Sequence, residues 1–112
     1  MSKVFSARIA AAASLSEAVD LEYTTLVAVI MPSAWTAADL TFQVSYNNVT
    51  FVDLYDAIGA EVALVVDASR CVSIPAISNT VPPVRYLKVR SGPSVAPVTQ
   101  AAARVIALVG EY

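Results

Sequence analysis

The stretch of sequence that decides the fold is LTFQVSYNNVTFVDLY, residues 40–55. In its first half Leu40, Phe42, Val44 and Tyr46 alternate with the polar residues between them. An alternation with a period of two is typical of a β-strand that buries one face and exposes the other. The sequence therefore predicts a half-buried strand over residues 40–46.

A turn follows this strand at Asn47 and Asn48, because asparagine tolerates positive φ. Residues 50–55 then resume extended character with Thr, Phe, Val and Tyr. Two extended segments joined by a short polar turn predict a β-hairpin.

Other segments outside the hairpin are also rich in β-branched or aromatic residues and bounded by turn-forming residues. They are residues 24–31, 61–66, 70–74, 84–91 and 103–109. Strands that recur at this spacing favour a β-sandwich or barrel. We therefore expect an all-β fold, an antiparallel sandwich with little helix beyond a single turn at residues 33–39. Residues 24–31 are almost continuously apolar, which indicates a strand covered on both faces or lying at a subunit contact.

The chain has 112 residues, a typical length for one domain. We expect a single domain over residues 1–112, with residues 1–13 as a candidate extended arm. Arg8 interrupts the apolar stretch near the amino terminus, so no signal peptide is expected. Residues 75–83 hold three prolines and are predicted to be an irregular crossing.

The composition is unusually apolar: 57% of the residues are hydrophobic and 14% are charged, against roughly 45–50% and 25% in ordinary soluble domains. Such a balance predicts an exposed apolar patch, and hence an oligomer or a component of a larger assembly. The alternative is that the excess lies in exposed alanines. The seven Lys and Arg residues are scattered and the net charge is −2, so nucleic-acid binding is not expected. No apolar run approaches the length of a transmembrane helix.

The residues that carry chemistry are scarce. The chain has no histidine, one cysteine and three glycines, so we expect no enzyme, no cofactor and no metal site. Cys71 is interpreted as a small hydrophobic side chain. Asp53, Asp56 and Glu61 lack the order of a calcium-binding loop and are interpreted as solvated residues at the end of the hairpin.

Candidate interface residues are large aromatics, asparagines of the turn and prolines in loops. They are Trp35, Tyr46, Asn47, Asn48, Tyr55, Pro82, Pro83 and Pro93. For the aromatics, the alternatives are core filling and stacking on sugars. Residues 2–13, 75–83 and 91–100 are expected to provide contacts because they lack regular strand pairing.

Residues 40–55, the later segment VRYLKVRSG (residues 84–92) and the segment AWTAADL (residues 34–40) resemble small structural proteins of tailed bacteriophages. More loosely they resemble galactose-binding-like jelly rolls. Asn47 and Asn48 stand where these proteins have Asp-Gly, a difference that leaves the hairpin intact. The resemblance covers about residues 14–109 and implies a jelly-roll sandwich of about eight strands.

The resemblance also implies a role in a virion. The chain would be a capsid cement or decoration protein that binds the major capsid protein, with a homotrimer as its expected oligomer. It would be made in the host cytoplasm and lie on the capsid surface. Two alternatives stay open: a tail, collar or fibre-attachment subunit, and a carbohydrate-binding module for host polysaccharide.

Overall fold

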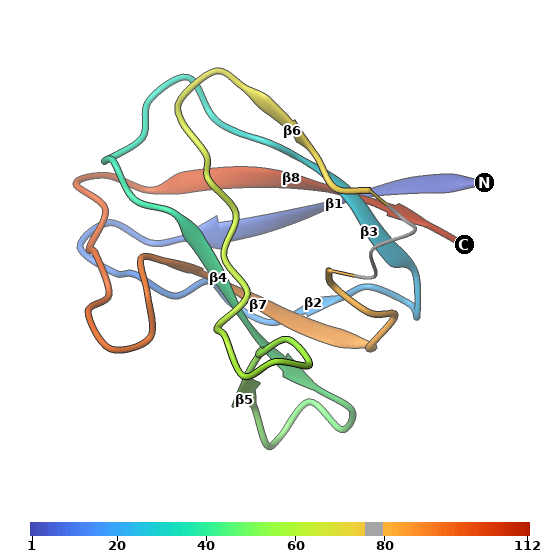
Figure 1. Cartoon of the computed structure of the whole chain (residues 1–112). Helices are drawn as coiled ribbons and strands as arrows, with labels where there is room; N and C mark the ends of the chain where they lie inside the picture. Colours follow the sequence, from blue (N-terminus) through green and yellow to red (C-terminus); the bar gives the residue numbers. More distant parts are fainter. Residues whose placement is uncertain (76–79) are drawn as a thin grey trace.

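Two antiparallel four-stranded sheets lie face to face in the computed structural model of the chain, which describes residues 1–75 and 80–112 (Figure 1). Sheet A contains, in spatial order, β1 (Ser2–Ile9), β8 (Arg104–Glu111), β3 (Thr25–Ile30) and β6 (Cys71–Ser73). Sheet B contains β2 (Val19–Asp20), β7 (Tyr86–Ser91), β4 (Leu40–Ser45) and β5 (Val52–Asp53). The part of the chain that the structure describes has no helix, and the predicted all-β antiparallel sandwich is confirmed.

The first four strands pair with the last four in reverse order: β1 with β8, β2 with β7, β3 with β6, and β4 with β5. The longest ladder joins β1 to β8, from Ser2 opposite Glu111 to Ile9 opposite Arg104. The chain thus folds like one long hairpin, β1–β4 against β5–β8, wound so that the core lies between the two sheets.

The core is built by the inward-facing residues of both sheets. The alternation read in β4 is confirmed, since Leu40, Phe42 and Val44 are buried. On the strands of sheet A, alternate residues likewise point into the core. The fully buried apolar side chains with the largest volumes are Phe42, Ile9, Leu21, Leu26, Leu40, Leu87, Ile106, Leu108, Val29, Val81 and Val89.

The predicted hairpin is confirmed, with a turn built by its own side chains. Asn47 Oδ1 accepts hydrogen bonds from the backbone N–H groups of Val49 and Thr50, at 2.9 and 3.0 Å. Asn48 has a φ of 59°, the left-handed conformation that asparagine tolerates. Because β4 ends at Ser45, Tyr46 does not continue the buried series and its side chain is 78% exposed.

Two expectations about local structure are wrong. Residues 61–66 form only two isolated bridges, Tyr55 to Glu61 and Leu40 to Leu64, instead of a strand. This segment leaves β5 in sheet B and leads to β6 in sheet A, so it cannot stay in register with either sheet. Residues 33–39 form bends instead of a helical turn.

The expectation that residues 2–13 lack regular strand pairing is also wrong for residues 2–9. Residues 2–9 are β1, which is hydrogen-bonded to β8 along its whole length and buries Phe5, Ala7 and Ile9. Of the predicted crossing at residues 75–83, positions 76–79 lie outside the described residues, and the other positions form no strand.

Candidate functional site

The outer face of sheet A, the side turned away from sheet B, is apolar. Its outward-facing positions alternate with the core positions on β1, β8 and β3. Val4 is 62% exposed, Val105 52% and Ile30 44%. Together with the partly exposed Ala28, Ala107 and Val109 and the exposed Cys71, these residues form what we call the apolar face.

The strand registers place these residues in rows across the sheet. Val109 lies opposite Val4 on one side and Ala28 on the other. In the next row Ala107 lies between Ser6 and Ile30, and Ile30 is in turn opposite Cys71. Two adjacent rows therefore contain only small or apolar side chains, without a charge.

Among the described residues, the charges on this face lie at its two ends. Arg8 lies opposite Val105 at one end, and Glu111 lies between Ser2 and Thr25 at the other. Glu111 has one ion pair, 3.6 Å from its Oε1 to the N-terminal ammonium. Arg8 makes no hydrogen bond or ion pair with the described residues.

The outer face of sheet B has the opposite character. Thr41, Gln43 and Ser45 of β4 face outward there, as do Lys88 and Arg90 of β7, although Thr41, Ser45 and Arg90 are buried on that side. A two-layer sandwich is normally apolar inside and polar on both outer faces. Sheet B follows this rule and sheet A does not, so the apolar face is a candidate contact surface.

A second group of exposed apolar side chains lies at the tip of the β4–β5 hairpin and in the turn that follows it, which we call the hairpin end. Its members are Tyr46, Val49, Val52, Tyr55 and Ile58. In Figure 1 this region projects below sheet B, on the side away from sheet A. The molecule thus exposes apolar side chains on two opposite sides.

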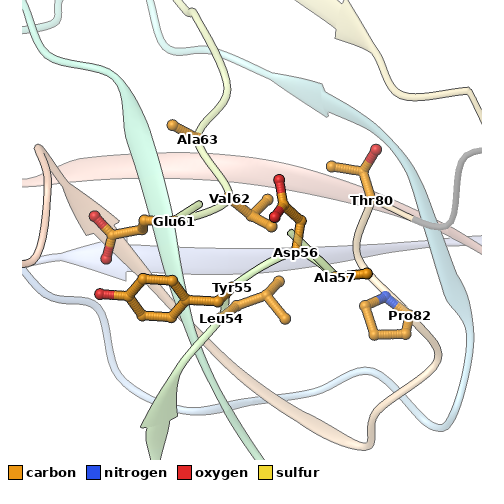
Figure 2. Close-up of a pocket in the computed structure, with 9 residues that line it drawn as sticks. All are labelled: Leu54, Tyr55, Asp56, Ala57, Glu61, Val62, Ala63, Thr80 and Pro82. Carbon is orange, nitrogen blue, oxygen red and sulfur yellow. The ribbon is translucent and has the colours of Figure 1, made fainter. Parts of the chain in front are cut away.

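A shallow hollow of about 510 Å³ adjoins the hairpin end. Leu54 and Val62 are its buried apolar residues, and Tyr55 and Pro82 lie on different sides of it (Figure 2). The hollow brings together Tyr55 and Pro82, two of the predicted interface residues.

Both carboxylates that line this hollow are already engaged. Asp56 Oδ1 accepts hydrogen bonds from the backbone N–H groups of Ile58 and Ala60, both at 3.0 Å. Glu61 binds Arg90 at 3.1 Å and accepts a hydrogen bond from the backbone N–H of Ser94. These two acids therefore hold loops in place through their hydrogen bonds.

The other predicted interface residues are dispersed. Tyr46, Asn47 and Asn48 lie at the hairpin tip and are exposed. Trp35 is half-buried against the core and its Nε1 donates to Ala38 O at 3.0 Å, so its ring fills the core edge. Pro93 lies at the opposite end of β4 from the hairpin tip, because the β7 end pairs with Leu40.

Pro83 is exposed in the loop before β7, next to Pro82. None of the individually predicted interface residues belongs to the apolar face. Two predicted segments reach it: residues 2–13, which were expected to provide contacts and contain Val4, and the almost continuously apolar segment 24–31, whose β3 residues contribute Ala28 and Ile30.

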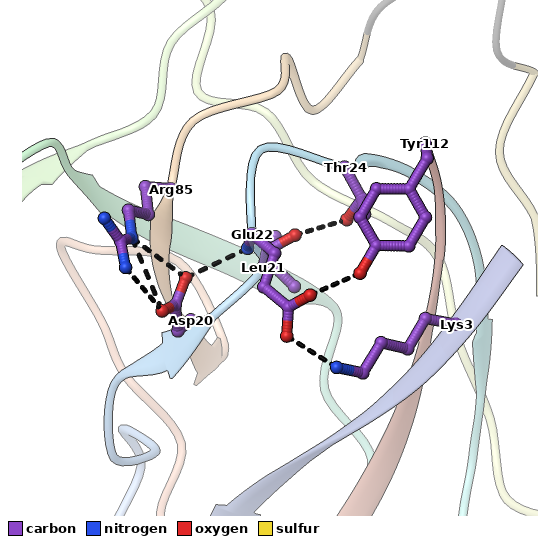
Figure 3. Close-up of polar contacts among 7 residues, drawn as sticks. All are labelled: Lys3, Asp20, Leu21, Glu22, Thr24, Arg85 and Tyr112. Carbon is purple, nitrogen blue, oxygen red and sulfur yellow. Dashed lines mark hydrogen bonds and ion pairs between the residues drawn. The ribbon is translucent and has the colours of Figure 1, made fainter.

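A polar cluster closes the end of the sandwich where the chain termini meet (Figure 3). Glu22 accepts a hydrogen bond from Lys3 Nζ at 2.6 Å and another from the Tyr112 hydroxyl. Asp20 binds Arg85, with 3.2 Å between Oδ2 and Nη2. The Lys3 ammonium and then the Tyr112 hydroxyl lower the pKa of Glu22, and Arg85 lowers the pKa of Asp20.

These shifts predict a loss of stability in acid. Because the pKa values of Asp20 and Glu22 are lower in the folded chain than their ordinary 3.8 and 4.5, both carboxylates stabilise the fold above about pH 4.5. Their contribution disappears as the pH falls through the folded values. Urea denaturation between about pH 3 and pH 6 should show this decline. In the double variant Asp20→Asn/Glu22→Gln the decline should be smaller, and an unchanged decline would contradict the assignment.

Within residues 1–75 and 80–112, no three or more Cys, Asp or Glu side chains gather closely enough to hold a metal ion. The same residues form no helix that is long and apolar enough to cross a bilayer. Comparison of the chain with models of protein families, with curated proteins and with solved structures finds no match.

Proposed function

We propose that the chain is a non-enzymatic structural subunit of a larger particle, a capsid cement or decoration protein of a tailed bacteriophage. The observation that carries the proposal is the apolar face, which lies on a sandwich whose other outer face is polar. A free monomer would leave this face in water at a cost that a bound partner removes. The virion setting rests on the resemblance of residues 34–55 and 84–92 to phage structural proteins.

We also propose the finer topology, a jelly roll. The pairing of β1 with β8, β2 with β7, β3 with β6 and β4 with β5, shared between two sheets, supports it. Jelly rolls build viral capsid domains as well as lectin domains, so the topology alone does not choose between a structural role and sugar binding.

A cement protein has to contact more than one neighbour, and the molecule has two apolar surfaces for this. The apolar face and the hairpin end lie on opposite sides of the sandwich (Figure 1). We assign the contact with the major capsid protein to the hairpin end, where Tyr46 and Tyr55 supply the aromatic side chains that anchor interfaces. The subunit would be made in the host cytoplasm and end on the capsid surface.

The test counts copies of the chain in purified particles from cells that produce it. A cement protein is expected in hundreds of copies per particle, and a tail, collar or fibre-attachment subunit in a handful. The variant Ile58→Asp should be missing from the heads, because it places a charge in the proposed contact. Val95→Asp is the matched control, since Val95 is equally exposed but lies outside both apolar surfaces. Absence of the wild-type chain from particles would overturn the proposal.

Carbohydrate binding is the second candidate, and the exposed rings of Tyr46 and Tyr55 favour it. Trp35 is unsuited to this role because it is held against the core. A glycan array with the wild-type chain and the variant Tyr46→Ala tests this candidate. Binding that disappears in a folded variant would support it, and no binding by the wild type would exclude it.

A further inference from the structure

We propose that the apolar face binds the apolar face of a second copy of the chain, about a two-fold axis that runs across the strands. The strands of the two copies then run in opposite directions, and Arg8 of each copy lies over Glu111 of the other. This inference rests on the proposed function in one respect, the identification of the apolar face as a contact surface.

The shape of the face fits a second sheet. Its central rows contain Val4, Val109, Ala28, Ala107 and Ile30, side chains that are short enough to interdigitate between two facing sheets. Sheets that stack in this way lie about 10 Å apart. A two-fold axis between the two rows places the valine row of each copy over the alanine and isoleucine row of the other, so the same contacts form twice.

The charges select this arrangement over the parallel one. Arg8 has no partner among the described residues, and Glu111 has only the 3.6 Å ion pair with the exposed N-terminal ammonium. With antiparallel copies, each unpaired arginine meets a carboxylate at the rim, twice in the pair. With parallel copies, the ends that carry Arg8 would lie together and the ends that carry Glu111 would lie together, so neither Arg8 would meet the Glu111 of the other copy.

The size of the face sets the strength of the pair. Strand spacings of about 4.8 Å and rises of about 3.4 Å per residue give sheet A a footprint of about 400 Å². A symmetric pair would bury twice this footprint, about 800 Å² in total, which is below the range of stable specific interfaces and typical of weak ones. We therefore expect a reversible dimer with a Kd of about 10–100 μM in solution, which the high local concentration on a particle would saturate.

A two-fold pair replaces the homotrimer expected from the resemblance. One flat patch that binds a copy of itself closes after two subunits, whereas a trimer requires two different complementary patches on each subunit. The apolar face is one self-complementary patch.

Sedimentation velocity of the purified chain, up to about 1 mM, tests the proposal. The wild type should dimerise, and Ala107→Glu should remain monomeric because it places a charge in the centre of the face. Each of the reversals Arg8→Glu and Glu111→Arg should weaken the dimer about tenfold, and the double variant should restore it. Val95→Glu is the control for an exposed charge elsewhere, and far-UV circular dichroism with thermal denaturation shows that each variant is folded.

An alternative dimer would pair the two β1 strands along their free edges. That arrangement would tolerate Ala107→Glu, because Ala107 lies on β8 inside the sheet. It would also leave Cys71 on β6, at the far edge, reactive toward a thiol reagent at every concentration. The proposed dimer instead predicts that Cys71 reacts more slowly as the concentration rises.

A monomeric wild type, a dimeric Ala107→Glu variant or a double reversal that fails to restore the dimer would each overturn the pair. These outcomes test the dimer and do not test the proposed function. A monomeric chain that still decorates particles would overturn only the pair. A dimeric chain that is absent from particles would overturn only the cement role.

Discussion

The variant Arg90→Met is expected to lower the free energy of unfolding by about 3 kcal/mol. The Arg90 side chain is 7% exposed and makes three contacts: with Thr41 Oγ1 at 2.9 Å, Asp53 at 2.9 Å and Glu61 at 3.1 Å. Methionine keeps the apolar stem but leaves two carboxylates side by side without their cation. Equilibrium denaturation in urea measures the change.

Lys88→Met is the matched control, because Lys88 lies on the same strand and the same face of sheet B. Its ammonium only approaches the Phe51 ring, 4.4 Å from the centroid, so its loss should cost less than about 1 kcal/mol. Adding Glu61→Gln to Arg90→Met should recover part of the stability, since the cost arises from the uncompensated charge. Equal losses for Arg90→Met and Lys88→Met would contradict this explanation.

The Arg90 contacts also connect the core to the hairpin end. Asp53 belongs to β5, which pairs with β4 at only two positions, and Glu61 follows the turn that contains Ile58. Loss of Arg90 should therefore loosen the hairpin end before the rest of the sandwich unfolds. Hydrogen exchange of the β5 amides would show this as faster local opening.

The variant Gln100→Leu is expected to lower the free energy of unfolding by about 3 kcal/mol as well. The buried Gln100 amide donates to Thr36 O at 3.0 Å and to Ser91 Oγ at 2.7 Å, and accepts from Thr36 N at 2.8 Å and Arg104 Nε at 3.1 Å. Leucine fills the volume but leaves these groups without partners in a region with little access to water. Urea denaturation measures the loss.

Gln43→Leu provides the comparison, because Gln43 is half-buried on the outer face of β4 and its side chain makes no hydrogen bond to the described residues. This variant should change the stability by less than about 0.5 kcal/mol. An equally small change in the free energy of unfolding for Gln100→Leu would contradict this explanation. It would mean that water replaces the amide contacts and that the Gln100 side chain does not hold the loops together.

The local features of the fold could be predicted from the sequence because neighbouring residues encode them. The alternation of Leu40, Phe42 and Val44 predicts a strand, and Asn47 and Asn48 predict the turn that ends it. The segment 61–66 has an equally strong strand pattern, yet it forms only bridges. It lies where the chain passes from sheet B to sheet A, and no local pattern records that crossing.

The candidate site was less predictable than the fold. The sequence favoured aromatics and prolines as interface residues. Of the aromatics, Tyr46 and Tyr55 are exposed, and Trp35 is held against the core. It also offered residues 1–13 as a candidate extended arm. β1 was not predicted as a strand because its partner, β8, lies about a hundred residues away along the chain. Its outward-facing residues are short, and none of them by itself indicates a strand.

The sequence by itself determined that the chain is an all-β protein with an excess of apolar residues, because period and composition are properties of the chain. Only the tertiary structure decided where the excess lies. Val4, Ile30 and Val109 come from three strands that are distant in sequence, and long-range ladders place them on one face. A surface assembled in this way depends on the register between strands, which the alternation within each strand does not specify.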